Sequence, residues 1–405
     1  MFFALKGPNF NGNQFVIQAL ENDAGYAIVD EEIPEKNERI IMVPDVLQTL
    51  QELAGYHRTQ FDESNSGKKI PFIAITGSNG KTTSKELIHA VLSSTYITYT
   101  TEGNLNNHIG IPLTLLKIKP DAEMAIIEMG ANHLKEIEGY CSYTRPTHGV
   151  ITNCGKAHLE GFGSEEGIRK GKGELFDYLR ATHGTAFIMN DYDYLQNMSA
   201  GIPNVMTYGT QNADITGIVN RSSGLLEIGI THGANLPGIK TKLVGEYNLS
   251  NVLLAVAIGK HFNVPEEKIR QALEDYVPSN SRSQLIERDT NRIILDAYNA
   301  NPTSMKAAIE NFAKMDGTEK VLLLGAMMEL GQQSLNEHQA LIDQIKGHRW
   351  KNVVLVGGDF KTVSHDYLYF KDSDQAGEWF RQQNFKNTAV LIKGSRSTKM
   401  EKVLQ

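Results

Sequence analysis

One short segment constrains this chain more than any other. Residues 73–83 read Ile-Ala-Ile-Thr-Gly-Ser-Asn-Gly-Lys-Thr-Thr, an apolar strand followed by a glycine-rich turn, a lysine and two hydroxyls. Glycines let the backbone approach phosphate oxygens, a helix N-terminus attracts anions, Lys81 adds a charge, and Thr82 suits Mg²⁺. The segment predicts a nucleoside triphosphate loop in an α/β domain. It departs from the standard P-loop, because Ile75 replaces the first glycine of that motif. A structural glycine turn with a chance Gly-Lys-Thr is the alternative.

Composition limits the class of protein. With 405 residues the chain exceeds one ordinary core, so we expect two or three domains. A net charge of −7 argues against a general nucleic-acid binder. The cysteines, Cys141 and Cys154, lack CxxC spacing, which argues against zinc or a disulfide framework and fits the cytoplasm. No apolar run approaches the roughly 18 residues of a membrane span, and the first residues are not typical of a signal peptide.

The pattern of apolar runs predicts an α/β fold with three domains. Residues 1–68 form a small α/β unit that ends in a polar linker at 62–69. Residues 69–278 are doubly wound, and a second hinge is expected at 277–281. Residues 279–405 form a Rossmann-like unit without a GxGxxG fingerprint, so nothing there supports a dinucleotide. The buried strands of the two larger units are expected near 70–75, 124–128, 148–152, 186–189, 205–207, 292–295, 321–324, 353–356 and 389–392.

Polar residues follow several of these strands. Glu128 ends the strand at 124–128, at the edge where α/β sheets bind ligands, and suits Mg²⁺ shared with Thr82. A surface carboxylate is the alternative there. His158 lies among glycines, which favours a ligand or polar contact over a core histidine. Cations cluster at 169–172, where a solvated helix face is the ordinary explanation.

These motifs, in this order, resemble the Mur ligase superfamily, enzymes that join an amino acid or dipeptide to a carboxylate with the use of ATP. The resemblance covers nearly the whole chain and is strongest to the branch that adds D-alanyl-D-alanine. The segments that carry it are Phe2–Gly7 with Asn11 and Gly12, Thr76–Thr83, Glu128–Gly130, His158–Ser164, Asp296–Pro302, Gly325–Gly331 with His338, and Lys393–Arg396.

The resemblance implies roles for individual residues. Lys81, Glu128, His158 and Lys172 would be catalytic. Lys172 aligns with a lysine that CO₂ carbamylates, and nearby cations would help it lose its proton. Two Mg²⁺ ions would be held by Thr82 with Glu128 and by His158 with the Lys172 carbamate. ATP would contact Gly77, Ser78, Asn79, Gly80, Lys81, Thr82, Thr83, Asn248, Arg282 and Asp296. The substrates would contact Lys6, Asn104, Asn106, Thr152, Tyr298, Asn301, Lys393, Ser395 and Arg396.

The expected activity is ATP-dependent ligation of D-Ala-D-Ala to a UDP-N-acetylmuramoyl tripeptide through an acyl phosphate, in cell-wall precursor synthesis. We expect a cytoplasmic monomer with no nucleic-acid partner. The alternatives are a ligase that adds the third peptide residue, a folylpolyglutamate-type ligase, and an ATP-binding switch or remnant without ligase activity. Whether the tripeptide ends in lysine or diaminopimelate stays open.

Two departures from the family pattern carry expectations. Tyr247 stands where many relatives have histidine or phenylalanine. Family members have some thirty residues, including a D-S-R segment, ahead of the motif that here begins at Phe2. We therefore expect a shortened uridine-binding unit, and weaker binding of the nucleotide sugar than a form extended by about thirty residues would show, because one charge-assisted phosphate contact is lost.

Overall fold

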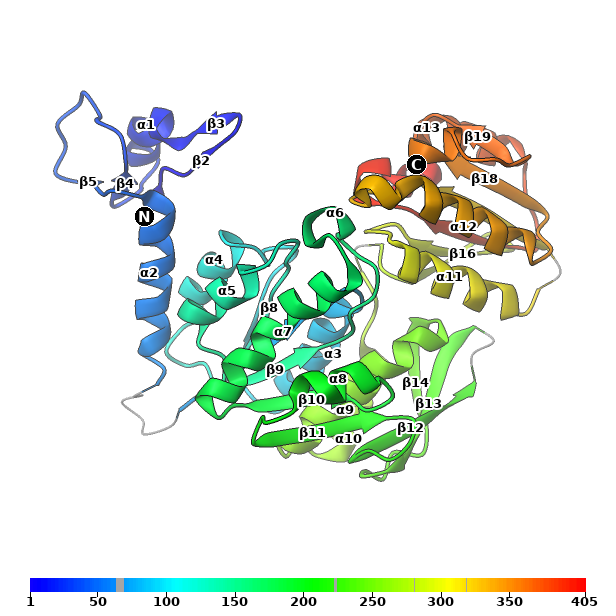
Figure 1. Ribbon diagram of the computed structural model, residues 1–405, viewed down its shortest axis with the longest axis horizontal. Helices are drawn as coiled ribbons and strands as arrows, with labels where there is room; N and C mark the ends of the chain where they lie inside the picture. Colours follow the sequence, from blue (N-terminus) through cyan, green and yellow to red (C-terminus); the bar gives the residue numbers. More distant parts are fainter. Residues whose placement is uncertain (63–68, 222–223, 280, 318) are drawn as a thin grey trace.

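The computed structural model describes residues 1–62, 69–221, 224–279, 281–317 and 319–405. Most of the predicted linker at 62–69, and Asn280 in the predicted hinge at 277–281, lie outside the described residues. Three α/β units follow one another along the chain (Figure 1), as the sequence predicts. In the described part of the chain, no helix has the length and apolar character needed to cross a membrane.

The N-terminal unit is a small sheet with one helix. Its described strands pair in parallel in the order β1-β4-β5, and the hairpin β2–β3 extends beside them. The core is formed by Ala4, Val16, Leu20, Ala27 and Val29. The bounds are β1 (Phe2–Phe3), β2 (Lys6–Gly7), β3 (Phe10–Asn11), the 3₁₀ helix η1 (Gly12–Phe15), α1 (Val16–Glu21), β4 (Ala27–Val29) and β5 (Ile40–Met42).

Helix α2 (Val46–Thr59) leads from this unit to the next and packs on it. Figure 1 shows α2 running down beside α4 and α5 of the central unit. Its Arg58 is buried, lies 3.8 Å above the Phe72 ring and donates to the carbonyls of Thr144 and Arg145, each at 2.9 Å. The last helix of the predicted N-terminal segment therefore shares a core with the central unit.

The described residues of the central unit form a nine-stranded sheet in the order β14-β13-β12-β11-β10-β9-β6-β8-β7. The strands from β6 to β12 that neighbour one another pair in parallel, and every residue of β6 and β8 is buried, as expected of strands covered on both faces. The strands are β6 (Phe72–Thr76), β7 (Thr98–Thr100), β8 (Met124–Glu128), β9 (His148–Ile151), β10 (Thr185–Met189) and β11 (Asn204–Gly209), followed by β12 (Ile215–Arg221), β13 (Leu225–His232) and β14 (Ile239–Val244).

An antiparallel extension, β12–β13–β14, was not predicted from the sequence. Helices cover both faces of the remaining sheet, as Figure 1 shows for α3 and α9 on one side and α7 on the other. The helices are α3 (Lys81–Ser93), α4 (Gly110–Leu116), α5 (Glu136–Thr144), α6 (Leu159–Phe162), α7 (Glu165–Thr182), α8 (Asp193–Ser199), η2 (Glu246–Asn248), α9 (Leu249–His261) and α10 (Glu266–Asp275).

The C-terminal unit carries, among its described residues, a six-stranded sheet in the order β15-β16-β20-β17-β18-β19. Its strands are parallel except β15, which pairs antiparallel with β16. The strands are β15 (Gln284–Arg288), β16 (Asn291–Asp296), β17 (Glu319–Gly325), β18 (Asn352–Val356), β19 (Leu368–Phe370) and β20 (Thr388–Lys393). The helices are α11 (Pro302–Lys314), η3 (Gly331–Gln333), α12 (Ser334–Lys346), η4 (Gly358–Lys361), α13 (Ser373–Gln382), η5 (Arg396–Thr398) and η6 (Met400–Leu404).

Candidate active site

The predicted nucleotide loop joins β6 to α3, and two of its glycines are required by its shape. Gly77 has φ +139°, and a Cβ there would lie 2.0 Å from Thr152 Oγ1. Gly80 has φ +80°, and a Cβ there would lie 2.6 Å from Asn251 Oδ1. Both conformations disfavour side chains, and both spaces are filled by neighbouring segments. The loop is therefore tightly packed and directs the N-terminus of α3 into the cavity described below.

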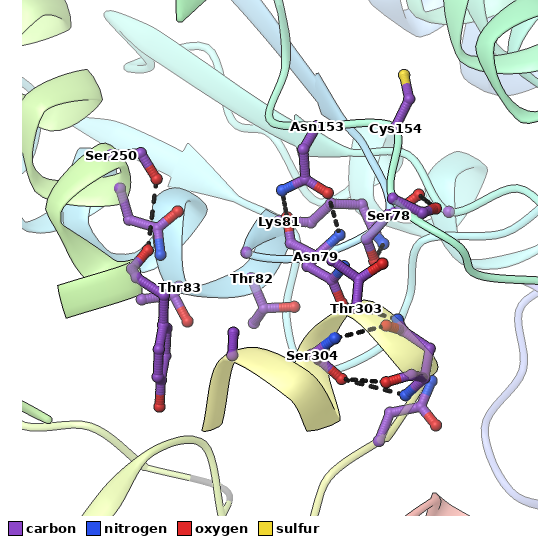
Figure 2. Close-up of a pocket in the computed structure, with 18 of the residues that line it drawn as sticks. Ser78, Asn79, Lys81, Thr82, Thr83, Asn153, Cys154, Ser250, Thr303 and Ser304 are labelled. Carbon is purple, nitrogen blue, oxygen red and sulfur yellow. Dashed lines mark hydrogen bonds between the residues drawn. The ribbon is translucent and has the colours of Figure 1, made fainter. Parts of the chain in front are cut away.

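Asn153, which follows β9, holds this loop and was missed by the sequence analysis. Its carbonyl accepts from the Ser78 N–H at 2.8 Å, its Oδ1 accepts from the Asn79 N–H at 3.1 Å, and its Nδ2 donates to the Asn79 carbonyl at 3.1 Å. Figure 2 shows Asn153 directly beside Asn79. The Thr152 hydroxyl, predicted to meet substrate, also donates to the Asn79 carbonyl, at 2.7 Å. The position of Asn153 after a strand next to β6 is the signal that could have identified it.

Lys81 lies back across its own loop. Its Nζ donates to the Gly77 carbonyl at 2.6 Å and the Ser78 carbonyl at 3.4 Å. Burial lowers the pKa of Lys81 below its usual value, and the positive charge of Arg282 acts in the same direction. An anion at the loop would offset both effects, since it would pair with the ammonium.

Thr82 and Glu128 meet, as the resemblance implied. Thr82 Oγ1 donates to Glu128 Oε1 at 3.1 Å, and Asn106 Nδ2 donates to the same oxygen at 2.7 Å. Glu128 is 1% exposed, and its Oε2 has no hydrogen-bond partner in the part of the chain that the structure describes. A buried carboxylate oxygen left unpaired beside a hydroxyl suits a hard divalent cation. Within the described ranges no three His, Cys, Asp or Glu side chains form a metal cage. A single buried carboxylate beside the Thr82 hydroxyl fits Mg²⁺, which usually takes one or two carboxylates together with phosphates and water.

Lys172 is a buried amine one layer below the cavity wall. It is 1% exposed, its Nζ donates to the Ala131 carbonyl at 2.8 Å, and it lies 5.0 Å from the Phe162 ring centre. Burial, and then the charge of Lys81, lowers the pKa of Lys172 to about 7. Near neutral pH much of this amine is uncharged, which is the form that reacts with CO₂. The residue therefore fits the carbamate that the resemblance implied.

His158 reaches the C-terminal unit. Its backbone is left-handed, with φ +54°, and Nδ1 lies 2.6 Å from Oε2 of Glu329, whose φ is +62°. The contact lacks hydrogen-bond geometry, and His158 Nδ1 has no other partner among the described residues. His158 lowers the pKa of the Glu329 carboxyl. The Glu160 N–H also donates to the Glu329 carbonyl at 3.2 Å, so the two units touch at this loop.

The end of the cavity near α9 carries the predicted nucleoside contacts. Asn248 is 2% exposed, and its Nδ2 donates to the Val244 carbonyl at 2.8 Å. Asn251 Nδ2 in turn donates to Asn248 Oδ1 at 2.9 Å. On the C-terminal side, the Arg282 guanidinium lies 3.5 Å from the ring centre of Tyr298. Its Nε is buried and has no partner within the described ranges.

Two residues predicted to contact different ligands form an ion pair with each other. Lys393 Nζ lies 2.5 Å from Asp296 Oδ2 in a nearly buried ion pair. Ser395 is buried as well, donating to the Ala300 carbonyl at 3.2 Å and accepting from the Met328 N–H at 3.0 Å. The Arg396 side chain, 66% exposed, is 5.8 Å from the Tyr298 ring and 3.4 Å from Glu401. Of the cations predicted to bind the dipeptide, Arg396 is the more accessible.

A cavity of about 770 Å³ brings most of the predicted residues together, with walls from both larger units. Figure 2 shows its loop side, with Thr303 and Ser304 from α11 facing Ser78 and Asn79, and Thr83 near Ser250 at the other end. The predicted residues in its wall are Ser78, Asn79, Gly80, Lys81, Thr82, Thr83, Asn106, Glu128, His158, Asn248, Arg282, Asp296, Tyr298, Asn301 and Lys393.

The other predicted residues lie outside this wall. Lys6 is in the N-terminal unit, where its Nζ is 3.1 Å from Asp30 and 3.3 Å from Glu31. Asn104 is exposed in the segment between β7 and α4. Gly77, Thr152, Lys172 and Ser395 support the wall from behind, and Arg396 is on the surface nearby. Arg169, whose guanidinium is 5.0 Å from the Tyr194 ring, lines the cavity although it was not among the predicted contacts.

Comparison with known proteins identifies the family. Residues 75–259 match the Mur ligase middle domain, and residues 281–396 match the glutamate ligase domain of Mur ligases. The UDP-N-acetylmuramoyl-tripeptide–D-alanyl-D-alanine ligase of Bacillus subtilis is 34% identical over the whole of this chain and 89% of its own length. This chain belongs to the Mur ligase family. The Escherichia coli enzyme of the same name is 32% identical to this Mur ligase, over the whole chain and 90% of its own length.

Solved structures agree with this assignment. The MurF of Acinetobacter baumannii superposes on this Mur ligase with a TM-score of 0.89 and 29% identity, covering 99% of this chain and 88% of that one. A MurF ligase from Thermotoga maritima in complex with ADP gives a TM-score of 0.88 and 25% identity, covering 99% and 92%. The expected α/β architecture is therefore confirmed.

Proposed function

We propose that this Mur ligase joins D-Ala-D-Ala to a UDP-N-acetylmuramoyl tripeptide with the use of ATP, and so makes the pentapeptide precursor of peptidoglycan. The observation that carries the proposal is the placing of Lys81, Thr82 and Glu128 in one cavity with α11 of the C-terminal unit. Relatives named for this activity are 34% and 32% identical over the whole chain.

The alternative ligases are less well supported. A solved diaminopimelate-adding Mur ligase matches this chain with a TM-score of 0.58 and 18% identity, and a folylpolyglutamate synthase with 0.62 and 12%. Identities this low indicate the shared fold alone. The segment from Asp296 to Pro302 and the run from His158 to Ser164 also favour the D-Ala-D-Ala branch.

The proposed reaction has two steps. The terminal carboxylate of the tripeptide attacks the γ-phosphorus of ATP, and the bond between that phosphorus and the oxygen bridging to the β-phosphate breaks. ADP departs, and the tripeptide now carries an acyl phosphate. The free amine of D-Ala-D-Ala then attacks the acyl carbon, loses a proton, and phosphate departs. The chain contributes position and charge, because Lys81 and the loop amides bind phosphate oxygens that would otherwise repel the attacking carboxylate.

Thr82 with Glu128 would hold one Mg²⁺, and His158 with a carbamylated Lys172 would hold a second. These ions would neutralise charge on the transferring phosphoryl group. Lys172 carbamate would form when the neutral amine adds to CO₂ and loses a proton, which converts a buried cation into a carboxylate-like ligand. The pKa of about 7 at Lys172 supports the carbamate. Glu128 Oε2, which has no partner among the described residues, supports the metal site with Thr82.

The remaining substrate contacts are also proposals. Lys6 would meet the nucleotide sugar, Asn104 and Asn106 the peptide, and Tyr298 with Arg396 the dipeptide carboxylate. Thr152, Lys393 and Ser395 would act indirectly, since their polar atoms already bind the protein. We further propose that the enzyme acts as a monomer in the cytoplasm, where ATP and UDP-linked precursors are available.

A mass-spectrometric ligation assay tests the proposed function. The complete chain would be supplied with ATP, Mg²⁺, D-Ala-D-Ala and either the lysine- or the diaminopimelate-ended tripeptide, and phosphate release would be followed in parallel. We expect pentapeptide with at least one tripeptide, and phosphate release that depends on the dipeptide. Phosphate release unaffected by D-Ala-D-Ala, without product, would indicate an ATP-binding switch or remnant instead.

A further inference from the structure

The first turn of α11 fixes the orientation of one amide side chain. Asn301 is the N-cap of this helix, and its Oδ1 accepts from the Ser304 N–H at 2.9 Å, while its own N–H donates to Ser304 Oγ at 3.1 Å. A backbone N–H is always a donor, so the atom that faces it must be the oxygen of the Asn301 amide. The other amide atom of Asn301 is therefore the nitrogen, which can only donate.

That nitrogen crosses from the C-terminal unit to the nucleotide loop. Asn301 Nδ2 donates to Asn79 Oδ1 at 2.7 Å. Because the oxygen of the Asn79 amide faces Asn301, its nitrogen is turned to the opposite side. The orientation of the Asn79 side chain is thus determined, through Asn301, by the cap of a helix in another domain.

The nitrogen of the Asn79 amide has no acceptor among the residues that the structure describes. The backbone N–H and carbonyl of Asn79 are occupied by Asn153 and Thr152. Its side-chain Nδ2 is buried and has no hydrogen-bond partner in the part of the chain that the structure describes. A buried donor without an acceptor costs about 1–3 kcal/mol, so a group of this kind in an active-site loop calls for an acceptor supplied by a ligand.

The surroundings indicate the chemistry of that acceptor. Asn79 lies in the cavity wall two residues before Lys81, at the N-terminus of α3, where positive potential favours an anion. The same turn of α11 also contacts the segment after β9, since Thr303 Oγ1 accepts from the Lys156 N–H at 3.0 Å. The acceptor is therefore an anionic oxygen enclosed between the loop and α11.

We propose that Asn301 is a positioning residue that turns the Asn79 amide so that its NH₂ group binds the γ-phosphoryl group of ATP. This inference rests on the proposed use of ATP. Asn79 touches the reacting group, and Asn301 acts through it from the other domain. Docking of the C-terminal unit then completes the phosphate site, and ADP, which lacks the γ-phosphoryl group, gains nothing from this donor.

Two substitutions separate this role from the capping role of Asn301. Asn301→Ser and Asn301→Asp both keep a strong N-cap, so the helix and the fold should persist. The hydroxyl of Asn301→Ser lies one bond closer to the backbone than the amide nitrogen that now spans 2.7 Å to Asn79 Oδ1, and the ionised carboxylate of Asn301→Asp has no hydrogen to donate, so both variants lose the donor that faces Asn79. In Asn301→Asp the new carboxylate instead attracts the Asn79 NH₂ group, which rotates the donor away from the nucleotide, while Asn301→Ser controls for the added negative charge.

The test is calorimetric titration of the complete chain with ADP and with a non-hydrolysable ATP analogue. We expect each variant to lose about tenfold or more in affinity for the analogue, the effect of one hydrogen bond to a charged group, with ADP affinity and melting temperature close to wild type. In an Asn79→Ala background, Asn301→Ser should have no further effect on the analogue.

Two outcomes would overturn the proposed role of Asn301, and a third would overturn the proposed use of ATP. Equal losses for ADP and the analogue would show that Asn301 serves domain docking only. A further tenfold loss from Asn301→Ser in the Asn79→Ala background would show that it acts through another group. Both results overturn the inference and leave the proposed function intact. If the wild-type chain binds neither nucleotide, the proposed function itself fails.

Discussion

At the scale of single residues, burial decides which of several similar side chains has unusual chemistry. Lys170 and Lys172 are two positions apart in sequence, and the spacing alone did not separate them. On α7 they face opposite ways, so Lys170 is exposed while Lys172 is buried near Lys81. A buried cation next to another cation gives up its proton more readily, which supports the proposed role of Lys172 as the amine that reacts with CO₂.

Lys172→Ala should abolish ligation, because the second metal site loses its proposed carboxylate-like ligand. Short carboxylic acids in solution should restore part of the activity by replacing the carbamate. Carbon-13 NMR of the wild type in labelled bicarbonate should show a carbamate signal that Lys172→Ala lacks. This signal should grow between about pH 6 and 8, since the neutral amine forms as the pH rises through the lowered pKa of about 7. Near-wild-type turnover in Lys172→Ala would contradict the assignment.

Glu128→Gln should raise the Mg²⁺ concentration needed for half-maximal activity by about tenfold, with a smaller effect on ATP affinity. The amide keeps the shape of the side chain and its contact with Thr82, but it lacks the charge that a hard cation prefers. A Mg²⁺ titration of phosphate release measures the shift, and Glu123→Gln, at an exposed carboxylate outside the cavity, serves as the control. An unmoved titration would mean that Glu128 is only a strand-end carboxylate.

Other residue roles depended on pairings that a sequence does not display. Asp296 and Lys393 were predicted to serve different ligands, yet β16 and β20 lie side by side with these two residues in register. Ninety-seven residues separate them, so only the order of strands in the sheet reveals the ion pair. Asn153 was missed for a related reason, because its role follows from β9 lying next to β6.

At the scale of elements, the buried parallel strands were the most predictable part of the fold. Each of β6, β8, β17 and β20 contains a continuous apolar run, and the predicted ranges agree with the observed ones within about two residues. The antiparallel strands β12–β14 escaped prediction. β12 and β13 mix buried and exposed positions irregularly, and the pairing of the three strands contains register shifts, so neither a continuous run nor clean alternation marks β12 and β13. β14 alternates between buried and exposed positions only from Ile239 to Leu243.

Gly77→Ala and Lys81→Ala should separate the shape of the nucleotide loop from its charge. The alanine Cβ at position 77 would overlap Thr152 at a backbone angle that disfavours it, so we expect a loss of about 2–4 kcal/mol in unfolding free energy.

Lys81→Ala removes two hydrogen bonds but also a partly buried charge, so its cost in unfolding free energy should stay near 1 kcal/mol or less while ATP turnover disappears. Urea unfolding and phosphate release together test both. A cooperative loss of folding in Lys81→Ala would favour a structural role for that lysine.

At the scale of the whole molecule, the cavity exists because two units meet. The segment after β9 bears several contacts to the C-terminal unit, including Lys156 Nζ to Glu337 at 2.7 Å and His158 Nδ1 to Glu329 at 2.6 Å. The sequence predicts both units and many of the residues that line the cavity, but contacts between units depend on docking and leave no periodic signal. The described contacts between the two units therefore include scattered polar pairs that neither unit's sequence pattern marks.

Lys156→Glu should weaken this docking, because the new carboxylate would face Glu337 and lie near Glu165. We expect about a five- to tenfold rise in KM for ATP, as a partly exposed pair and its reversal are worth roughly 1 kcal/mol, together with a larger radius of gyration in small-angle scattering. The double variant with Glu337→Lys should restore both quantities. If the double variant is no better than the single one, the effect does not pass through this pair.

The low reactivity expected of the two natural thiols would allow the distance between the central and C-terminal units to be measured with labels. Cys141 and Cys154 are both buried, burial raises the pKa of each, to about 11 for Cys154, and the chain carries no other cysteine. Thiol reagents act on thiolates that solvent can reach, so the native protein should react slowly. A cysteine placed on the surface of each of two units would then take fluorescent labels without removal of the natural ones, and energy transfer between the dyes would report the distance between the units as nucleotide binds.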